Sequence, residues 1–419
     1  MKLHELGYEL PKNWREATIS DVTSKVGSGA TPRGGSSVYT NNGIPLVRSQ
    51  NVLDNSFSNA GLAFLSDQSA SSLKNVELRA NDVLLNITGD SILRCCLLPD
   101  VMIGGRVNQH VAIIRASDAV IPLYLQKWLV QDWFKDFMLS HSAGATRKAI
   151  TKGQILSFPI ALPPLPEQRR IAGVLRALDN KIDLLNHQRT LCRKLGLAYT
   201  ERLTRDSAKV PLEYYTRSIS RGVTPKYYKN EEETPIHVLN QRCVRDGWVS
   251  LNSARLMLPR RREKKAAMAE FSDLLVNSTG QGTLGRVGCW SHQAPIYADS
   301  HMTIVKADPQ RIYPILLPYL VFPLQSEIEQ MAEGSTGQTE LSPSNLGSLK
   351  VPFIRFEEQG TVAAQLLALE EMAHHCSIET RILAELRDTL LPELMSGRMR
   401  VDEAGCLVSE ALDEEVADV

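Results

Sequence analysis

The chain has 419 residues, of which 43% are hydrophobic and 22% charged, and its 47 basic residues balance its 47 acidic residues. This composition is typical of a globular protein with two or three domains, and no apolar run reaches the roughly 18 residues of a membrane span. The segment Met1–Glu9 has no apolar signal-peptide core, and the seven cysteines are scattered. We therefore expect a cytoplasmic protein with reduced thiols.

The first 160 or so residues contain short apolar runs separated by turns. Val83–Ile87 and Val111–Ile114 predict buried strands, and Leu123–Leu139 predicts one amphipathic helix. Pro163–Pro166 prevents helix formation just upstream, and the Pro-Glu-Gln sequence that ends at Gln168 is a typical helix start. The mixture of strands and helices indicates an α+β fold.

A heptad pattern follows this helix start and returns near the end of the chain. Its apolar positions are Ile171, Leu175, Leu178, Ile182, Leu185, Cys192 and Tyr199, and then Val362, Leu366, Leu369, Ala373, Cys376, Leu383 and Leu390. About four heptads in each segment predict a coiled coil of two helices, each ~40 residues long. The link from Leu203 to Pro211 is short, which favours an antiparallel pair. Irregular packing is expected where the pattern is interrupted, at Arg189, Gly196, Thr380 and Arg387.

A duplication organises the whole chain. Five matched pairs occur in the same order at offsets of 191 to 193 residues: Gly29–Pro32 with Gly222–Pro225, Ile44–Val52 with Ile236–Val244, Asp82–Gly89 with Asp273–Gly280, His110 with His301, and Glu167-Gln168 with Glu358-Gln359. A duplicated domain predicts a pseudo-symmetric molecule. Two-fold symmetry suits the recognition of two half-sites on DNA.

The predicted fold class is α+β: two pseudo-symmetric α/β domains separated by two long helices that form an antiparallel coiled coil. The expected segments are a first domain (1–162), a central helix (163–205), a second domain (206–354), a C-terminal helix (355–397) and a tail (398–419). From Asp402 onward the tail contains seven acidic residues and no basic one. We expect this tail to be disordered.

Four motifs resemble those of the specificity subunits of type I restriction–modification systems: Ser28–Pro32, Asn81–Gly89, Pro164–Ala172 and Leu386–Gly397. The resemblance covers residues 10–400. It implies two target-recognition domains that each recognise one half of a split DNA sequence, and a chain without catalytic activity or cofactor. The implied partners are double-stranded DNA, two modification subunits that methylate adenine with S-adenosylmethionine, and restriction subunits that use ATP and Mg²⁺.

The candidate DNA contacts follow from residue type. Arg, Asn and Gln carry the paired donors and acceptors that base recognition requires, whereas Gly/Thr loops with nearby cations suit phosphates. In the first repeat the expected contacts are Ser28, Gly29, Thr31, Arg33, Arg48, Gln50, Asn51, Thr88, Arg94, Thr146, Arg147 and Lys148. In the second repeat they are Arg221, Thr224, Lys226, Asn240, Gln241, Arg242, Arg260, Arg261, Thr279, Gln281, Arg286, Gln338 and Thr339.

Each candidate also has a purely structural interpretation as a turn cap, a Gly/Pro turn, a solvated loop or an exposed charged face. The two repeats also differ: Thr279–Gly285 contains three glycines, whereas Thr88–Arg94 lacks the second. This difference predicts another backbone path in the first repeat.

The sequence lacks motifs for amino-methyl transfer, nucleotide triphosphates and dinucleotides. His374–Cys376 has no second ligand pair at zinc-finger spacing, so we expect neither a metal site nor catalytic residues. Two alternatives stay open. One is a coiled-coil adaptor that binds proteins without recognising DNA, and the other is a self-contained methyltransferase.

Overall fold

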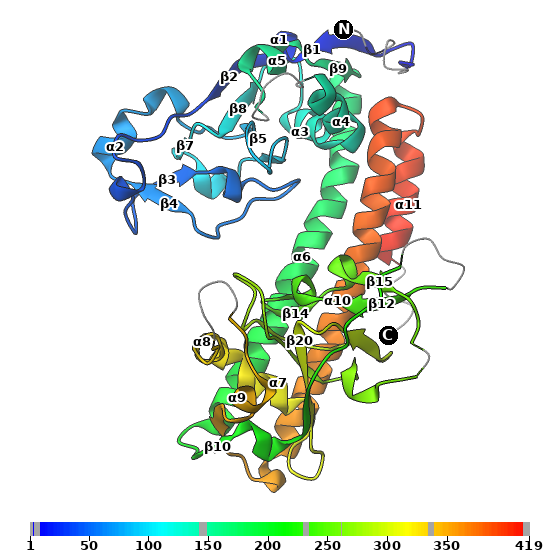
Figure 1. Ribbon diagram of the computed structural model, residues 1–419. Coiled ribbons are helices and arrows are strands. Elements are labelled where there is room, and N and C mark those ends of the chain that lie inside the picture. The colour runs from blue at the N-terminus through cyan, green and yellow to red at the C-terminus, as the bar shows by residue number, and fades with distance from the viewer. Residues whose placement is uncertain are drawn as a thin grey trace. The chain divides into compact units, whose positions relative to one another are not determined.

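The computed structural model describes Leu3 and residues 9–141, 149–228, 234–260, 262–333 and 339–413. The chain forms two compact units: unit 1 comprises Met1–Asp183 and Arg381–Val419, and unit 2 comprises Leu184–Thr380. The divisions fall inside two long helices, α6 (Leu165–Thr204) and α10 (Phe356–Ser396), so each helix contributes one part to each unit (Figure 1). No described helix is long and apolar enough to cross a membrane.

Unit 1 contains a four-stranded sheet in the order β2-β8-β5-β6 and a three-stranded sheet in the order β4-β3-β7. A separate antiparallel pair, β1-β9, joins the start of the unit to the segment before α6. The strands are β1 (Arg15–Thr18), β2 (Thr23–Ser28), β3 (Ile44–Val47), β4 (Ala63–Leu65), β5 (Val83–Asn86), β6 (Cys95–Leu97), β7 (Arg106–Val107), β8 (Val111–Ala116) and β9 (Pro159–Leu162). The helices are α1 (Ile19–Val22), α2 (Asp67–Ser71), α3 (Pro122–Val130), α4 (Asp132–His141) and α5 (Lys152–Ser157).

Unit 2 repeats this topology. Its sheets have the orders β11-β20-β17-β18-β14-β13 and β15-β12-β19-β16, and its separate pair is β10-β21. The strands are β10 (Lys209–Pro211), β11 (Thr216–Arg221), β12 (Ile236–Leu239), β13 (Val244–Arg245), β14 (Gly247–Val249), β15 (Arg255–Met257), β16 (Met268–Ala269), β17 (Leu274–Asn277), β18 (Val287–Cys289), β19 (Ile296–Ala298), β20 (Met302–Ala307) and β21 (Lys350–Pro352). The helices are α7 (Leu316–Val321), α8 (Gln325–Gln330) and α9 (Pro343–Gly347). The duplication in the sequence is therefore a duplication of the fold, with β13, β14 and β16 added in unit 2.

The central strands of both units are apolar on both faces. β5 and β17 are buried at every position, as the runs in the sequence predicted. Each begins beside a buried aspartate paired with a cation of the neighbouring strand: Asp82 with Arg115 at 2.6 Å, and Asp273 with Lys306 at 2.9 Å. Burial raises the pKa of the Asp273 carboxyl, and the hydrogen bond from Lys306 opposes this shift.

The single helix predicted over Leu123–Leu139 is wrong, because the chain forms α3 and α4 with a break at Gln131. Gln131 has an extended backbone (φ −62°, ψ 136°) that ends α3. Its side-chain amide donates to the carbonyl of Trp128 at 3.2 Å. The break allows Trp128, Trp133 and Phe134 to pack edge to face, with ring centroids 5.5–6.2 Å apart.

The two long helices that the heptad pattern predicted are present and antiparallel. In unit 2, three residues of α6 lie against three residues of α10. The pairs are Gln188 with Cys376, Arg193 with Glu370 and Gly196 with Leu366, so residue numbers rise along α6 as they fall along α10. Most predicted seam residues are buried, among them Leu175, Leu178, Leu366, Leu383 and Leu390. Tyr199, Val362 and Leu369 are half-buried.

Three of the four interruptions of the seam, Arg189, Gly196 and Arg387, have specific contacts. Arg189 stacks on Trp248 at 4.0 Å, and burial lowers the pKa of its guanidinium to about 10. A Cβ atom on Gly196 would collide with the ring of Tyr319, so glycine permits this close approach. Arg387 pairs with Asp179 at 3.3 Å.

A buried glutamine fixes each long helix to its own unit. Gln168 accepts a hydrogen bond from the Ile121 amide at 2.9 Å and donates to the Pro163 carbonyl at 2.9 Å. Gln359 accepts from the Tyr313 amide at 3.0 Å and donates to the Arg311 carbonyl at 3.1 Å. The repeated Glu-Gln pair therefore has a structural role, because each amide satisfies backbone groups that would otherwise be buried without partners.

The prediction of a disordered tail is wrong for α11 (Val401–Asp413). Gly397 (φ +72°) is the first residue after α10 and begins the turn that leads to α11. Ala404 and Val408 are then buried on one face of α11, and Asp402 pairs with Arg170 of α6. Four of the acidic residues lie on this amphipathic helix, whose apolar face is covered, which stabilises it despite their charge. Residues 414–419 lie outside the described residues.

Candidate nucleic-acid interface

The candidate residues of unit 1 gather at one end of its sheets. β8 runs antiparallel to both β2 and β5, with Ser28 opposite Ala112 and Asn86 opposite Val111. The ends of β2 and β5 therefore lie at the start of β8. The end of β3 joins them, because the Asn86 side chain donates to the Ser49 carbonyl at 2.9 Å. We call this edge, with Thr31, Arg48, Gln50, Thr88 and His110, the polar end of unit 1.

Hydrogen bonds connect two of the predicted residues across this polar end. Thr31 donates to the Gln109 side chain at 2.5 Å, and the Gln109 amide lies 2.9 Å from His110 Nε2. His110 Nδ1 in turn lies 2.6 Å from the Thr88 hydroxyl. The network joins the Gly-x-Thr-Pro loop to the Thr-Gly loop through two residues that the site prediction did not include.

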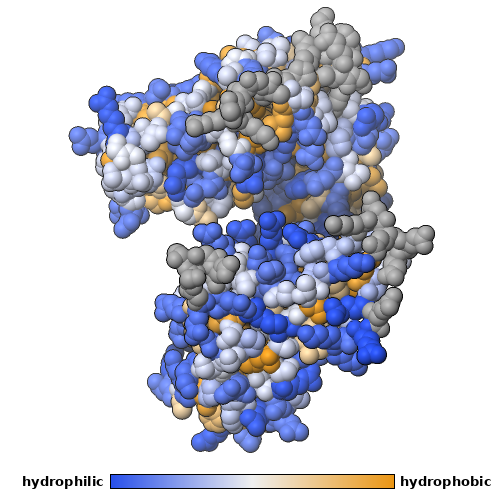
Figure 2. Space-filling model, in the orientation of Figure 1, coloured by the Kyte–Doolittle hydropathy of each residue, from blue (hydrophilic) through white to orange (hydrophobic). Residues whose placement is uncertain are grey.

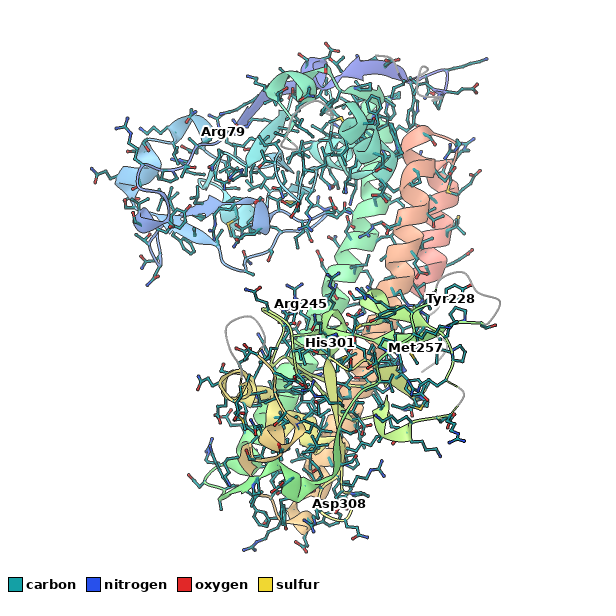
Figure 3. All side chains as sticks on the ribbon, viewed as in Figure 1. Arg79, Tyr228, Arg245, Met257, His301 and Asp308 are labelled. Carbon is teal, nitrogen blue, oxygen red and sulfur yellow. The ribbon has the colours of Figure 1, made fainter. Side chains whose placement is uncertain are left out.

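Unit 2 has the same arrangement, and its polar end is hollowed into a cleft of about 770 Å³. In Figure 3 the labels of His301 and Asp308 mark the opposite ends of β20, and the cleft lies at the His301 end. It is lined by Gln241, Thr279, Gly280, Gln281, Gly282, Leu284, His301, Glu329, Thr339 and Glu340. The structure thus brings together four residues that were predicted from separate segments: Gln241, Thr279, Gln281 and Thr339.

A threonine–histidine pair occupies the same place in both units. Thr279 Oγ1 lies 2.8 Å from His301 Nδ1, as Thr88 lies beside His110. The backbone amide of His301 donates to Asp299 at 2.9 Å, and that of His110 donates to Asn108 at 3.0 Å. Burial raises the pKa of the Asp299 carboxyl, and the His301 amide opposes this shift. The site prediction missed both histidines, although their match within the duplication was the available signal.

The Thr-Gly loops differ in backbone path, as the missing glycine predicted: unit 2 has one more residue between the equivalent hydrogen bonds, and Gly282 (φ +72°) has no left-handed counterpart between Gly89 and Leu93. The two loops are alike only where they end. Leu93 has φ +66° and donates to the Asn86 carbonyl at 2.7 Å, while Gly285 has φ +82° and donates to the Asn277 carbonyl at 2.8 Å. Leu93 is buried and adopts the left-handed backbone that glycine adopts in unit 2. Burial of its side chain offsets the cost of this conformation, about 1 kcal/mol.

Three predicted contacts have side-chain atoms that are already hydrogen-bonded inside the protein. Asn51 is buried and donates to the Ser58 carbonyl at 2.8 Å. Asn240 is buried, donates to the Ser253 carbonyl at 2.5 Å and accepts from the Arg242 amide at 2.9 Å. Arg221 is half-buried and donates to the carbonyls of Ser300 and Leu341 and to Glu340. All three order loops of the polar ends rather than present free groups.

The first glycine of each Gly-x-Thr-Pro loop has a packing role. A Cβ atom on Gly29 would collide with the carbonyl oxygen of Val107, and one on Gly222 with that of Asp299. Each loop therefore passes directly over the strand connection that leads to the histidine. Only glycine permits that approach.

The other predicted residues differ in exposure. Arg48 is half-buried, donates to the Gly61 carbonyl and lies over the Tyr39 ring at 5.5 Å. Arg286 is half-buried and donates to the Gly282 carbonyl at 2.8 Å. Exposed positions include Ser28, Thr31, Arg33, Gln50, Arg94, Thr224, Lys226, Arg242, Arg260, Gln281 and Thr339. Thr146, Arg147, Lys148, Arg261 and Gln338 lie outside the described residues.

Hydrophilic side chains cover much of the face of unit 2 that Figure 2 shows, and apolar residues are scattered among them. Among the described residues, no group of three or more His, Cys, Asp or Glu residues could hold a metal ion. The polar ends therefore offer amide, hydroxyl, imidazole, carboxylate and guanidinium groups. These are the groups with which proteins contact bases and phosphates.

Comparison with known proteins agrees with this geometry. Residues 11–191 match the family described as type I restriction modification DNA specificity domain. A relative from Methanocaldococcus jannaschii, assigned as the specificity subunit of the type I restriction enzyme MjaX, is 19% identical over 96% of each chain. The crystal structure of a type I restriction–modification S subunit from M. genitalium has the same fold, with a TM-score of 0.56 at 17% identity over 92% of this chain and 97% of that one. The chain is thus similar to type I restriction–modification specificity subunits, and its structure contains the domain-and-helix unit twice.

Proposed function

We propose that the chain recognises a bipartite, asymmetric DNA sequence as the specificity subunit of a type I restriction–modification complex. The observation that carries the proposal is the occurrence of two polar ends of equal architecture with unlike side chains. Thr88 and Thr279 occupy equivalent positions, as do His110 and His301, whereas Ser49 corresponds to Gln241 and Gln50 to Arg242. Two polar ends of equal fold that carry different side chains suit a DNA target whose two halves differ in sequence.

The proposal divides the chain by role. Residues 1–162 and 206–354 form the two target-recognition domains, and 163–205 and 355–397 form the helices that join them. The helices provide the surface for two modification subunits, to which restriction subunits bind, in the cytoplasm where the DNA lies. S-adenosylmethionine, ATP and Mg²⁺ belong to those partners in this scheme, and the chain itself does not catalyse a reaction.

Binding to duplex DNA is the first expected result. In a gel-shift assay the full-length chain should retain random-sequence duplex at low salt, and the logarithm of its affinity should fall linearly with log salt by about 0.9 per phosphate contacted. Absence of binding at low salt, even with modification subunits present, would favour the protein-binding adaptor. Methyl transfer by the purified chain alone would instead favour the self-contained methyltransferase.

The length of the paired helices is expected to set the spacer between the half-sites. Four residues inserted into both helices, after Asp183 and after Thr380, lengthen each by ~6 Å, which corresponds to one or two base pairs at ~3.4 Å each. Sequencing of methylated sites should then show a longer spacer between unchanged half-sites. Altered half-sites with an unchanged spacer would contradict the role of the helices.

A further inference from the structure

The cleft of unit 2 has a chemical bias that the general proposal does not explain. Its lining residues, among those that the structure describes, include two carboxylates, Glu329 and Glu340, and no lysine or arginine. Phosphate groups would be repelled by such a lining, whereas hydrogen-bond donors would be favoured. The cleft is therefore better suited to the edge of a base than to the DNA backbone.

Glu340 and Glu329 differ in their partners. Glu340 accepts a hydrogen bond from Arg221 at 2.6 Å, so its charge is neutralised by a neighbouring residue. Glu329 lies on α8 and accepts only from the neutral Gln325 amide, at 3.1 Å, among its described contacts. Glu329 is therefore the carboxylate in the cleft whose charge has no cationic partner among those contacts.

A glycine makes room for Glu329. A Cβ atom on Gly285 would collide with Glu329 Cγ, so the close packing of α8 on the Thr-Gly loop depends on this glycine. In unit 1 the equivalent hydrogen bond is donated by Leu93, which is buried. The glycine that admits Glu329 is thus a feature of unit 2.

A second hydrogen-bond acceptor, on a residue that lines the cleft, also favours a ligand that donates hydrogen bonds. Gln241 lines the cleft, and its side-chain oxygen is buried and has no hydrogen-bond partner among the described residues. A buried acceptor without a partner is unfavourable, so a ligand that donates to it would be favoured. In the major groove the only base donors are the exocyclic amino groups, N6 of adenine and N4 of cytosine.

We propose that Glu329 determines specificity in unit 2 by accepting a hydrogen bond from the exocyclic amino group of an adenine or a cytosine. The proposal rests on the proposed function, because it assigns a base class to the half-site that unit 2 recognises. The carboxylate accepts but cannot donate, so it disfavours the O6 and O4 acceptors of guanine and thymine at the same position.

The test begins with selection from a random duplex library by the full-length chain, in complex with the modification subunits. Within the selected site, each adenine is replaced in turn by purine and each cytosine by pyrimidin-2-one, which lack the amino group. At one position of one half-site the wild type should lose affinity by about 5- to 150-fold. Adenine and cytosine are distinguished by which replacement has this effect.

The variants then identify the residue. In Glu329→Ala the same replacement should cause no further loss, and Glu329→Gln, which can also donate, should accept guanine or thymine there. Glu327→Gln is the matched control, because Glu327 is exposed on the same helix and does not line the cleft. It should discriminate as the wild type does.

Two failures are distinguishable. If the wild type selects no sequence, the proposed function itself is wrong. If the wild type selects a bipartite sequence but Glu329→Ala retains the full preference for the amino group at every position, only the role of Glu329 is wrong. Hydrogen exchange of α8 in Glu329→Ala, compared with the wild type, shows whether the helix is still folded.

Discussion

Replacement of Glu370 by alanine is expected to destabilise unit 2 by about 3–5 kcal/mol, the cost of breaking a buried ion pair on one side. Glu370 is fully buried on α10 and accepts hydrogen bonds from Tyr319 at 2.7 Å and Ser291 at 3.0 Å. It also pairs with Arg193 of α6 at 3.0 Å. Alanine would leave the Arg193 guanidinium buried between the rings of Trp248 and Phe322 without a counter-charge.

Hydrogen exchange measured by mass spectrometry is the suitable measurement, because a chain of two units need not unfold in one step. Faster exchange is expected in β17, β18, α7 and the adjoining part of α6, with little change in unit 1. The control is Glu371→Ala, whose side chain is exposed one residue further along α10 and whose loss should change stability by less than about 0.5 kcal/mol. Equal effects of the two substitutions would show that the Glu370 cluster is not what fixes α10 to unit 2.

The features that the sequence predicted well are those encoded by periodicity. Apolar residues at most a and d positions are sufficient to predict α6 and α10, because a paired helix buries that pattern. The duplication likewise predicted two units of equal topology. Ile44–Val52 and Ile236–Val244 match in sequence, and each forms a strand that is followed by a short 3-10 turn.

The candidate site was less predictable, because the same residue types serve turns and bases. Asn51 and Asn240 have the side chains that recognise adenine, but the same amide groups are equally suited to satisfy loop carbonyls, and burial decides between the two roles. Glu329 reaches the cleft from a segment whose sequence has no apolar alternation or glycine pattern to mark it. Its position depends on how α8 packs on Gly285, which is a tertiary contact.

Tertiary contacts also explain why the helix breaks at Gln131 and why α11 folds. Local sequence around Leu123–Leu139 is continuous in apolar character, and the break is decided by aromatic packing among Trp128, Trp133 and Phe134. The acidic composition of the tail indicates disorder only while its apolar residues lack a surface to cover. Ala404 and Val408 find that surface within unit 1.

Exchange of residues 15–150 for the corresponding segment of a relative with another target is expected to change one half-site completely. The reason is that the polar end of unit 1 lies entirely within this segment, from Ser28 to His110. The exchanged segment must keep Asn55 and Lys127, because Lys127 bonds to both Asn55 and Asp179 of α6. The reciprocal exchange of 206–354 is the matched control and should change only the other half-site.

Sequencing of the sites that each exchanged complex methylates tests directly whether the two units recognise DNA independently. The account predicts one new half-site, one unchanged half-site and an unchanged spacer in each exchange. A change in both half-sites, or an unchanged target after either exchange, would contradict the assignment of one half-site to each polar end.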